Sequence, residues 1–89
     1  MWSEGFIKEV DAHRDYMVYF SAKVYDEPSE YGIYNGRLVK LKLKILGEIV
    51  CDYDRGWKTA PTCPAAKKAL RDLLYMCDGM SADAEISYE

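Results

Sequence analysis

The segment from residue 37 to residue 46 constrains the fold most, because apolar and cationic side chains alternate along it without a break. The apolar set and the lysines fall on opposite sides of an extended chain: Val39, Leu41, Leu43 and Ile45 against Lys40, Lys42 and Lys44. A period of two predicts a β-strand with one buried face. Asn35-Gly36 before it and Gly47 after it predict tight reversals. Residues 48–53 are expected to form a second strand, which completes a hairpin with one apolar and one cationic face.

Two further strands are expected upstream of this hairpin. Residues 4–10 are predicted to form a short first strand with Phe6 facing the core and Val10 a candidate for the same side, and residues 16–25 a longer second strand with strict alternation. The apolar side of the second strand and its opposite side are Val18, Phe20, Ala22 and Val24 against Tyr19, Ser21, Lys23 and Tyr25. The polar residues 11–15 suit a turn, so these two strands are expected to pair as an antiparallel hairpin.

After Trp57 the apolar pattern changes to a helical period. Thr62 is a candidate N-cap, Pro64 suits the first turn, and Gly79 is placed to end the helix in a left-handed conformation. The apolar residues that recur at helical spacing are Ala66, Ala69, Leu70, Leu73, Leu74 and Cys77. The opposite side is polar and carries Lys67, Lys68, Arg71 and Asp72. This pattern predicts one amphipathic helix.

These segments predict an α+β fold, a small four-stranded antiparallel meander packed on one C-terminal α-helix. Residues 1–79 would form a single domain, because a chain of 89 residues is too short for two independent cores. Residues 80–89 would form an acidic tail that is either frayed or adds a short edge strand. The sheet face away from the helix would present lysines and tyrosines to solvent.

Charge and hydropathy exclude several classes of protein. The net charge is −3, but residues 1–34 carry seven acidic and three basic residues, whereas residues 35–79 carry nine basic and five acidic ones. Weak overall acidity argues against direct nucleic-acid binding through bulk charge. No apolar run approaches the roughly 18 residues that cross a membrane, and the N-terminus MWSEGF lacks the features of a signal peptide. A cytoplasmic protein without a membrane partner is therefore expected.

The chemistry-bearing residues do not favour an enzyme. Three cysteines without a C-x-x-C spacing and a single histidine predict no disulfide framework, no metal site and no cofactor. Cys63, near a helix N-terminus, is placed where a thiol pKa can fall. However, no histidine and acid are placed to form a triad with it, and phosphate-binding and dinucleotide-binding glycine motifs are absent from the sequence.

Residues 53–57 carry the most specific local signal for binding. Arg55 offers a planar guanidinium to phosphate or carboxylate, and Trp57 offers a broad stacking surface. The alternative is structural, with Trp57 closing the core and Asp54 pairing with Arg55. Arg37 is expected either to pair with acidic residues of the preceding loop or to join Arg55 in an anion site. The sequence leaves these alternatives open.

Two other surfaces are candidates for contacts. On the open sheet face Lys40, Lys42 and Lys44 lie beside tyrosines, a combination that can hold an anion or stack a base. Strand lysines also serve simply to keep a sheet face solvated and free of aggregation. The loop between the predicted hairpins is acidic and rich in tyrosine, and it is a candidate for protein contacts. Its candidate residues are Tyr25, Asp26, Glu27, Glu30, Tyr31 and Tyr34.

Three segments carry a resemblance: FSAKVYDEPSEYGI at 20–33, GRLVKLKL at 36–43, and YDRGW followed by Pro61. Together they resemble a family of short uncharacterised proteins of bacteriophages, prophages and gut-associated Firmicutes, over residues 2–77. The family pattern has an acidic residue after the tryptophan, where this chain has Lys58. The resemblance implies a small phage-encoded protein in the host cytoplasm, and it carries over no activity and no catalytic residue.

A small phage protein without catalytic equipment is expected to bind a host factor. In one version it inhibits a host defence protein, for instance a CRISPR nuclease, and docks through its acidic N-terminal third and its tyrosine-rich loop. In the other it is a sponge for a signalling cyclic nucleotide, held at a homo-oligomer interface. Arg37, Arg55 and the strand lysines would then bind phosphates, while Trp57 or a tyrosine stacks on the base. A homo-oligomeric structural factor of the virion is a third class.

Overall fold

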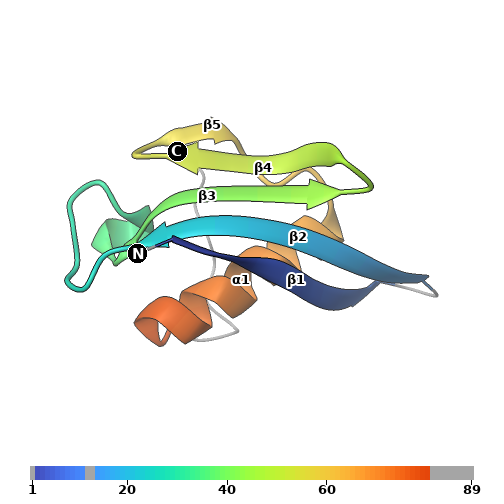
Figure 1. The fold of residues 1–89 in the computed structure, drawn as a ribbon, viewed down its shortest axis with the longest axis horizontal. Helices are drawn as coiled ribbons and strands as arrows, with labels where there is room; N and C mark the ends of the chain where they lie inside the picture. The colour runs from blue at the N-terminus through green and yellow to red at the C-terminus, as the bar shows by residue number, and fades with distance from the viewer. Residues whose placement is uncertain (1, 12–13, 81–89) are drawn as a thin grey trace.

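The structure, a computed structural model, describes residues 2–11 and 14–80. Five antiparallel strands follow one another across a single sheet in chain order, and one helix covers one face of it (Figure 1). The predicted α+β class is confirmed. The elements are β1 (Trp2–Asp11), β2 (Arg14–Val24), the 3₁₀ helix η1 (Ile33–Asn35), β3 (Leu38–Ile45), β4 (Glu48–Asp54), β5 (Trp57–Thr59) and α1 (Pro64–Asp78).

The predicted number of strands, four, is wrong, because the chain returns to the sheet after β4. β4 extends to Asp54, the chain reverses at Arg55 with a positive φ of 56°, and β5 pairs with β4 through Tyr53 and Trp57. β5 has only three residues, so its alternation is too short to be visible in the sequence. The segment predicted as a loop at 53–57 is therefore a tight turn between two strands.

Strand pairing confirms the predicted division of the sheet into two faces. The β2–β3 ladder places Tyr19, Ser21 and Lys23 opposite Lys44, Lys42 and Lys40, respectively. Opposite residues in a ladder point to the same side of a sheet, so the three lysines share one face. We call this face, which lies away from α1, the outer face. The register shifts after Lys23, and beyond the shift both Leu38 and Val39 are buried.

The core lies between the inner face of the sheet and α1. Most of the predicted core residues are buried: Val18, Ala22, Val39, Leu41, Leu43, Leu70, Leu73 and Leu74. Phe20, Val24 and Ile45 are partly buried against them. β4 contributes Cys51 and Tyr53, so its inward residues complete the apolar layer. Full burial of one leucine contributes about 2 kcal/mol, which makes this layer the main source of stability.

The β3–β4 hairpin turns at Leu46 and Gly47, whose φ values are 52° and 81°. The reversal expected at Gly47 is confirmed, although the strand ends at Ile45, one residue earlier than expected. Two successive positive φ values are typical of the two-residue turn that suits strand twist. Leu46 adopts this conformation although a leucine rarely has a positive φ. Its side chain is 95% exposed.

Asn35-Gly36 does not form the tight hairpin turn that the dipeptide predicts. Asn35 ends η1 with a φ of 55°, whereas Gly36 is extended with a φ of −98°. The glycine is required for space: a Cβ there would lie 2.5 Å from a carboxylate oxygen of Asp78 at the end of α1. This position therefore brings the start of β3 against the end of the helix.

The helix begins one residue later than its expected cap implies. Cys63, not Thr62, is the N-cap, and it makes no side-chain hydrogen bond to the helix. Pro64 is the first helical residue, as predicted, because a proline lacks the N–H that a first turn leaves unpaired. Gly79 ends the helix in the left-handed region with a φ of 66°, also as predicted.

Within residues 2–11 and 14–80, no helix is long and apolar enough to cross a membrane. The predicted acidic tail falls from residue 81 onward outside the described residues.

Candidate functional site

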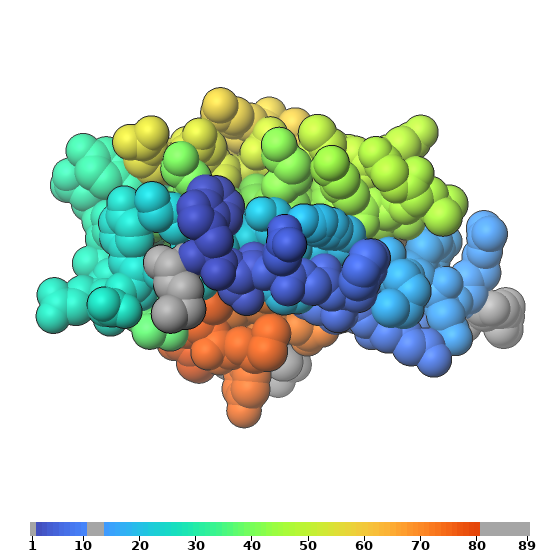
Figure 2. All heavy atoms as spheres, in the orientation of Figure 1, coloured from blue at the N-terminus to red at the C-terminus, as the bar shows by residue number. Residues whose placement is uncertain are grey.

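The connection between β2 and β3, which we call loop 25–36, stands at one end of the sheet (Figures 1 and 2). Its tyrosines are exposed, with relative exposures of 40% for Tyr25, 52% for Tyr31 and 46% for Tyr34. Its acidic residues Asp26, Glu27 and Glu30 are exposed as well. The six residues predicted as a contact loop are therefore all exposed.

Backbone hydrogen bonds close loop 25–36 on itself. The Tyr25 N–H donates to the Arg37 carbonyl at 2.8 Å, and the Ser29 N–H donates to the Gly36 carbonyl at 2.9 Å. The Gly32 N–H donates to the Ser29 carbonyl at 3.0 Å. The first two bonds join the two sides of the connection and the third closes a local turn, so the loop is a small ordered unit rather than an open chain.

Side chains fasten the same loop to the body of the protein. Ile33 is only 3% exposed and inserts into the core. The Tyr53 hydroxyl on β4 donates to the Tyr31 carbonyl at 2.8 Å. Burial raises the pKa of Tyr53 above its ordinary value, in keeping with a neutral hydroxyl that donates. The ring of Trp57 meets the Tyr53 ring edge-on at 4.9 Å, which supports Tyr53 from β5.

Arg37 contacts neither of its expected partners. Its Nε donates to the Cys77 carbonyl at 2.9 Å and lies 3.8 Å from a carboxylate oxygen of Asp78. Its backbone N–H donates to the same carboxylate at 3.0 Å. A guanidinium at a helix C-terminus is favourable because the last carbonyls carry partial negative charge. Arg37 therefore ties the end of loop 25–36 to the end of α1.

Arg55 and Trp57 carried the strongest sequence signal for binding, and they lie in different environments at the β4–β5 turn. Arg55 is exposed and pairs with Asp54 at 3.4 Å. Trp57 is partly buried against the core, which fits the structural alternative. It also lines a shallow cleft between the turn and loop 25–36, together with Gly32, Ile33, Tyr34, Asn35, Tyr53 and Gly56. Arg37, Arg55 and the strand lysines are thus not gathered around Trp57.

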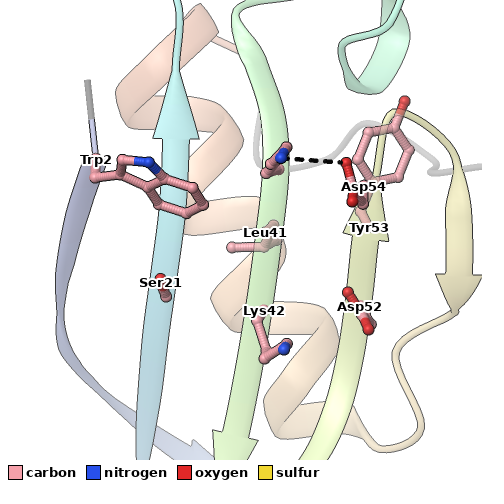
Figure 3. A pocket seen from close by; sticks show the side chains of 8 residues that line it. Trp2, Ser21, Leu41, Lys42, Asp52, Tyr53 and Asp54 are labelled. Carbon is pink, nitrogen blue, oxygen red and sulfur yellow. Dashed lines mark ion pairs between the residues drawn. The ribbon is translucent and has the colours of Figure 1, made fainter.

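The outer face is mixed in charge rather than cationic, because β4 places two carboxylates beside the lysines. Lys40 lies opposite Asp54 with its Nζ 3.8 Å from the carboxylate, and Lys42 lies opposite Asp52 (Figure 3). Lys58 of β5 also approaches Asp54, at 4.0 Å. Lys44 lies opposite Tyr19 in the β2–β3 ladder, and both line a hollow with Ser21 and Lys42.

A tryptophan that the sequence interpretation did not single out lies over this face. The indole of Trp2 on β1 extends across β2, and the Lys40 Nζ is 6.0 Å from its ring centroid (Figure 3). Such a cation–aromatic contact is moderately favourable at an exposed site. The hollow beneath is lined by Trp2, Ser21, Lys40, Leu41, Lys42, Asp52, Tyr53 and Asp54. The expectation that Phe6 and Val10 face the core is wrong, and with it Trp2 would also have been set inward. The β1–β2 register pairs Trp2 with Lys23 and Phe6 with Tyr19, so these residues lie on the outer face.

Two of the groups with a raised pKa belong to the surfaces above: Tyr53, through burial, and Tyr19 on the outer face, through its hydrogen bond to Glu4. Two others, Glu9 and Cys51, are buried. Burial raises the pKa of Glu9 to about 7, with a further upward contribution from the Asp72 carboxyl and a downward one from Lys68. Burial likewise raises the pKa of the Cys51 thiol to about 12, so this thiol is inert as a nucleophile. Among the described residues, no group of three or more histidine, cysteine or acidic side chains could hold a metal ion.

Fold and surfaces define a small α+β protein with an exposed loop, fastened by hydrogen bonds, at one end of its sheet. The chain belongs to a family described as a domain of unknown function, DUF7678, whose profile matches residues 1–78. No curated protein and no solved structure matches it.

Proposed function

We propose that this protein is a non-enzymatic binding protein that docks through loop 25–36 on a basic surface of a partner protein. The observation that carries the proposal is that three tyrosines and three acids are exposed on a loop already fastened by hydrogen bonds. Tyrosines on an ordered loop lose little conformational entropy when they bind. Acidic side chains add electrostatic steering toward a basic partner.

The partner in this proposal is a host defence protein, with a CRISPR nuclease as the leading class. The resemblance to short phage proteins supports this context. Such nucleases hold nucleic acid in a positively charged channel, and an acidic loop of fixed shape competes for a surface of that kind. The protein would then inhibit by occupying the nucleic-acid path, without chemistry of its own.

The test compares two matched charge reversals. Glu30→Lys changes loop 25–36, whereas Glu48→Lys changes an exposed acid at the start of β4, outside the loop. The readouts are inhibition of DNA cleavage by purified CRISPR nucleases and co-purification of those nucleases with the protein. The proposal expects wild type and Glu48→Lys to inhibit and Glu30→Lys to lose most inhibition. No inhibition and no complex, or equal inhibition by both variants, would contradict it.

The outer face favours a second candidate, a sponge for a signalling cyclic nucleotide. The supporting observation is the hollow in which Trp2 lies beside Lys40 and Lys42, since an indole can stack a base while ammonium groups bind phosphate. Cyclic di- and trinucleotides would then raise the melting temperature according to ligand concentration and affinity. Trp2→Ala would abolish that shift, and an unchanged melting temperature across the panel removes this candidate.

A further inference from the structure

β1 is a long strand at the edge of the sheet. It has ten residues and pairs with β2, and none of the described residues pairs with its other edge. Figure 2 shows it in dark blue across the front of the molecule. On the outer face it exposes Trp2 at 59%, Phe6 at 67% and Val10 at 54%. An exposed, apolar edge of this length is a ready template for another strand.

We propose that β1 pairs antiparallel with β1 of a second copy of this chain, with Phe6 at the two-fold axis. The sheets of two copies would then join into one continuous sheet. Each copy uses the same surface, as a two-fold interface requires.

The residues of β1 complement themselves in this register. Trp2 lies opposite Val10 of the second copy, and Phe6 lies opposite Phe6 of the second copy. Glu4 lies opposite Lys8 of the second copy, so each dimer contains two attractive pairs of opposite charge. All these side chains belong to the outer face, because they alternate with residues that face α1. Opposite charges and apolar pairs across a ladder are both stabilising.

The neighbouring registers lack this complementarity. A shift by two residues sets an apolar side chain against a charge, with Phe6 opposite either Glu4 or Lys8. A shift by four sets Glu4 against Glu4 or Lys8 against Lys8, which is repulsive. A shift by one residue opposes outer-face to inner-face positions and mismatches the outward N–H and C=O groups, which alternate along an edge strand. One register is therefore selected.

Contacts within each copy hold the charged pair in place. The Tyr19 hydroxyl donates to the Glu4 carboxylate at 2.7 Å, and Lys8 pairs with Asp15 at 3.3 Å. Both interactions run along the outer face from β1 to β2, so Glu4 and Lys8 are presented on that face. Lys68 donates to the Val10 carbonyl at 2.7 Å, and this carbonyl has a second lone pair for the new strand.

Charges on natural edge strands commonly block pairing. Glu4 and Lys8 of β1 would block pairing of two β1 strands only if like charges lay opposite each other. The selected register avoids this. Loop 25–36 lies at the β2–β3 connection and is not part of this interface. The dimer and the proposed partner binding are therefore independent, and each can fail without the other.

The test uses the full-length protein and two charge reversals, Glu4→Lys and Lys8→Glu. Wild type is expected to sediment as a dimer in analytical ultracentrifugation. Each variant alone brings like charges together twice per dimer, so its dimer dissociation constant should rise about tenfold or more. An equimolar mixture of the two variants restores both attractive pairs and should form heterodimers. Circular dichroism confirms that each variant is folded.

Cross-linking tests the position of the axis. Phe6→Cys places two thiols directly opposite each other, within the Cα separation that a disulfide requires, and should give an intermolecular disulfide under mild oxidation. Glu4→Cys is the matched control, because its two copies would be about 14 Å apart along the strands. The proposal would be overturned if wild type were a monomer or if the charge reversals left the dimer dissociation constant unchanged. Equal cross-linking of both cysteine variants would overturn it as well.

Discussion

Arg37 holds together three parts of the chain that are distant in sequence. Its side chain contacts the Cys77 carbonyl and the Asp78 carboxylate, and its own carbonyl accepts the Tyr25 N–H. The sequence suggested either pairing with acidic residues of the preceding loop or an anion site shared with Arg55. The actual partners are the last residues of a helix that begins 27 positions later, at Pro64, and no local pattern encodes that contact.

Replacement of Arg37 by alanine should therefore destabilise the fold. The loss removes a charge-assisted hydrogen bond and leaves the Cys77 carbonyl without it, so we expect the free energy of unfolding to fall by about 2 kcal/mol. The free energy of unfolding of Arg37→Lys should lie between those of wild type and Arg37→Ala, because lysine keeps the charge but not the fork geometry of the guanidinium. Urea unfolding measures both. Arg55→Ala is the control and should change stability by less than about 0.5 kcal/mol, because Arg55 is exposed. Equal losses at Arg37 and Arg55 would contradict this role.

Glu9 predicts a pH dependence whose sign follows from its environment. Its pKa is raised from 4.5 to about 7, so between these values the folded protein binds more protons than the unfolded chain. The free energy of unfolding contributed by this group should therefore fall as pH rises from about 4.5 to 7. Burial beneath α1 and the nearby Asp72 cause this, and Lys68 opposes it only in part.

Glu9→Gln removes this titration. At pH 8 the variant should be more stable than wild type by about 2 kcal/mol, and near pH 4.5 the difference should largely vanish. Denaturant unfolding across this range measures the effect. An identical pH slope in both proteins would show that Glu9 is not the responsible group.

At the scale of elements, the β3–β4 turn is a site of local strain. Leu46 has a φ of 52°, in a region where residues other than glycine, asparagine and aspartate are disfavoured. Leu46→Asn would create the Asn-Gly turn that this conformation favours, and should raise the free energy of unfolding by about 0.5–1 kcal/mol. Leu46→Ala keeps the strain and should change little. Thermal unfolding compares the three proteins, and destabilisation by asparagine would refute the argument.

The elements differ in how far the sequence predicts them. Strict alternation predicted β2 and β3 and the face that each residue occupies, since burial of one face fixes the register. Helical spacing predicted α1 and its glycine cap. β5 escaped prediction because three residues carry no measurable period. The mixed charge of the outer face was not predicted, because Asp52 and Asp54 lie beside Lys42 and Lys40 only once β4 pairs with β3.

At the scale of the whole molecule, the two proposed contact surfaces lie at different places on the sheet. Loop 25–36 lies where β2 passes into β3, and the free edge of β1 lies along the side of the sheet (Figure 1). The six contact-loop residues were predicted from composition alone. Their fixed arrangement was not, because it depends on three distant contacts: Tyr53 donates to the Tyr31 carbonyl, Ile33 of the loop inserts into the core, and Arg37 contacts the end of α1.

The central claim is that loop 25–36 is ordered before it binds anything. Hydrogen exchange of the free protein tests it most directly, at the amides of Ser29, Gly32 and Gly36, which donate within the loop. We predict exchange at least about tenfold slower than in an unfolded peptide, and faster exchange in Tyr53→Phe, which loses the bond to the Tyr31 carbonyl. Exchange of these three amides at the unfolded rate in wild type would contradict the account.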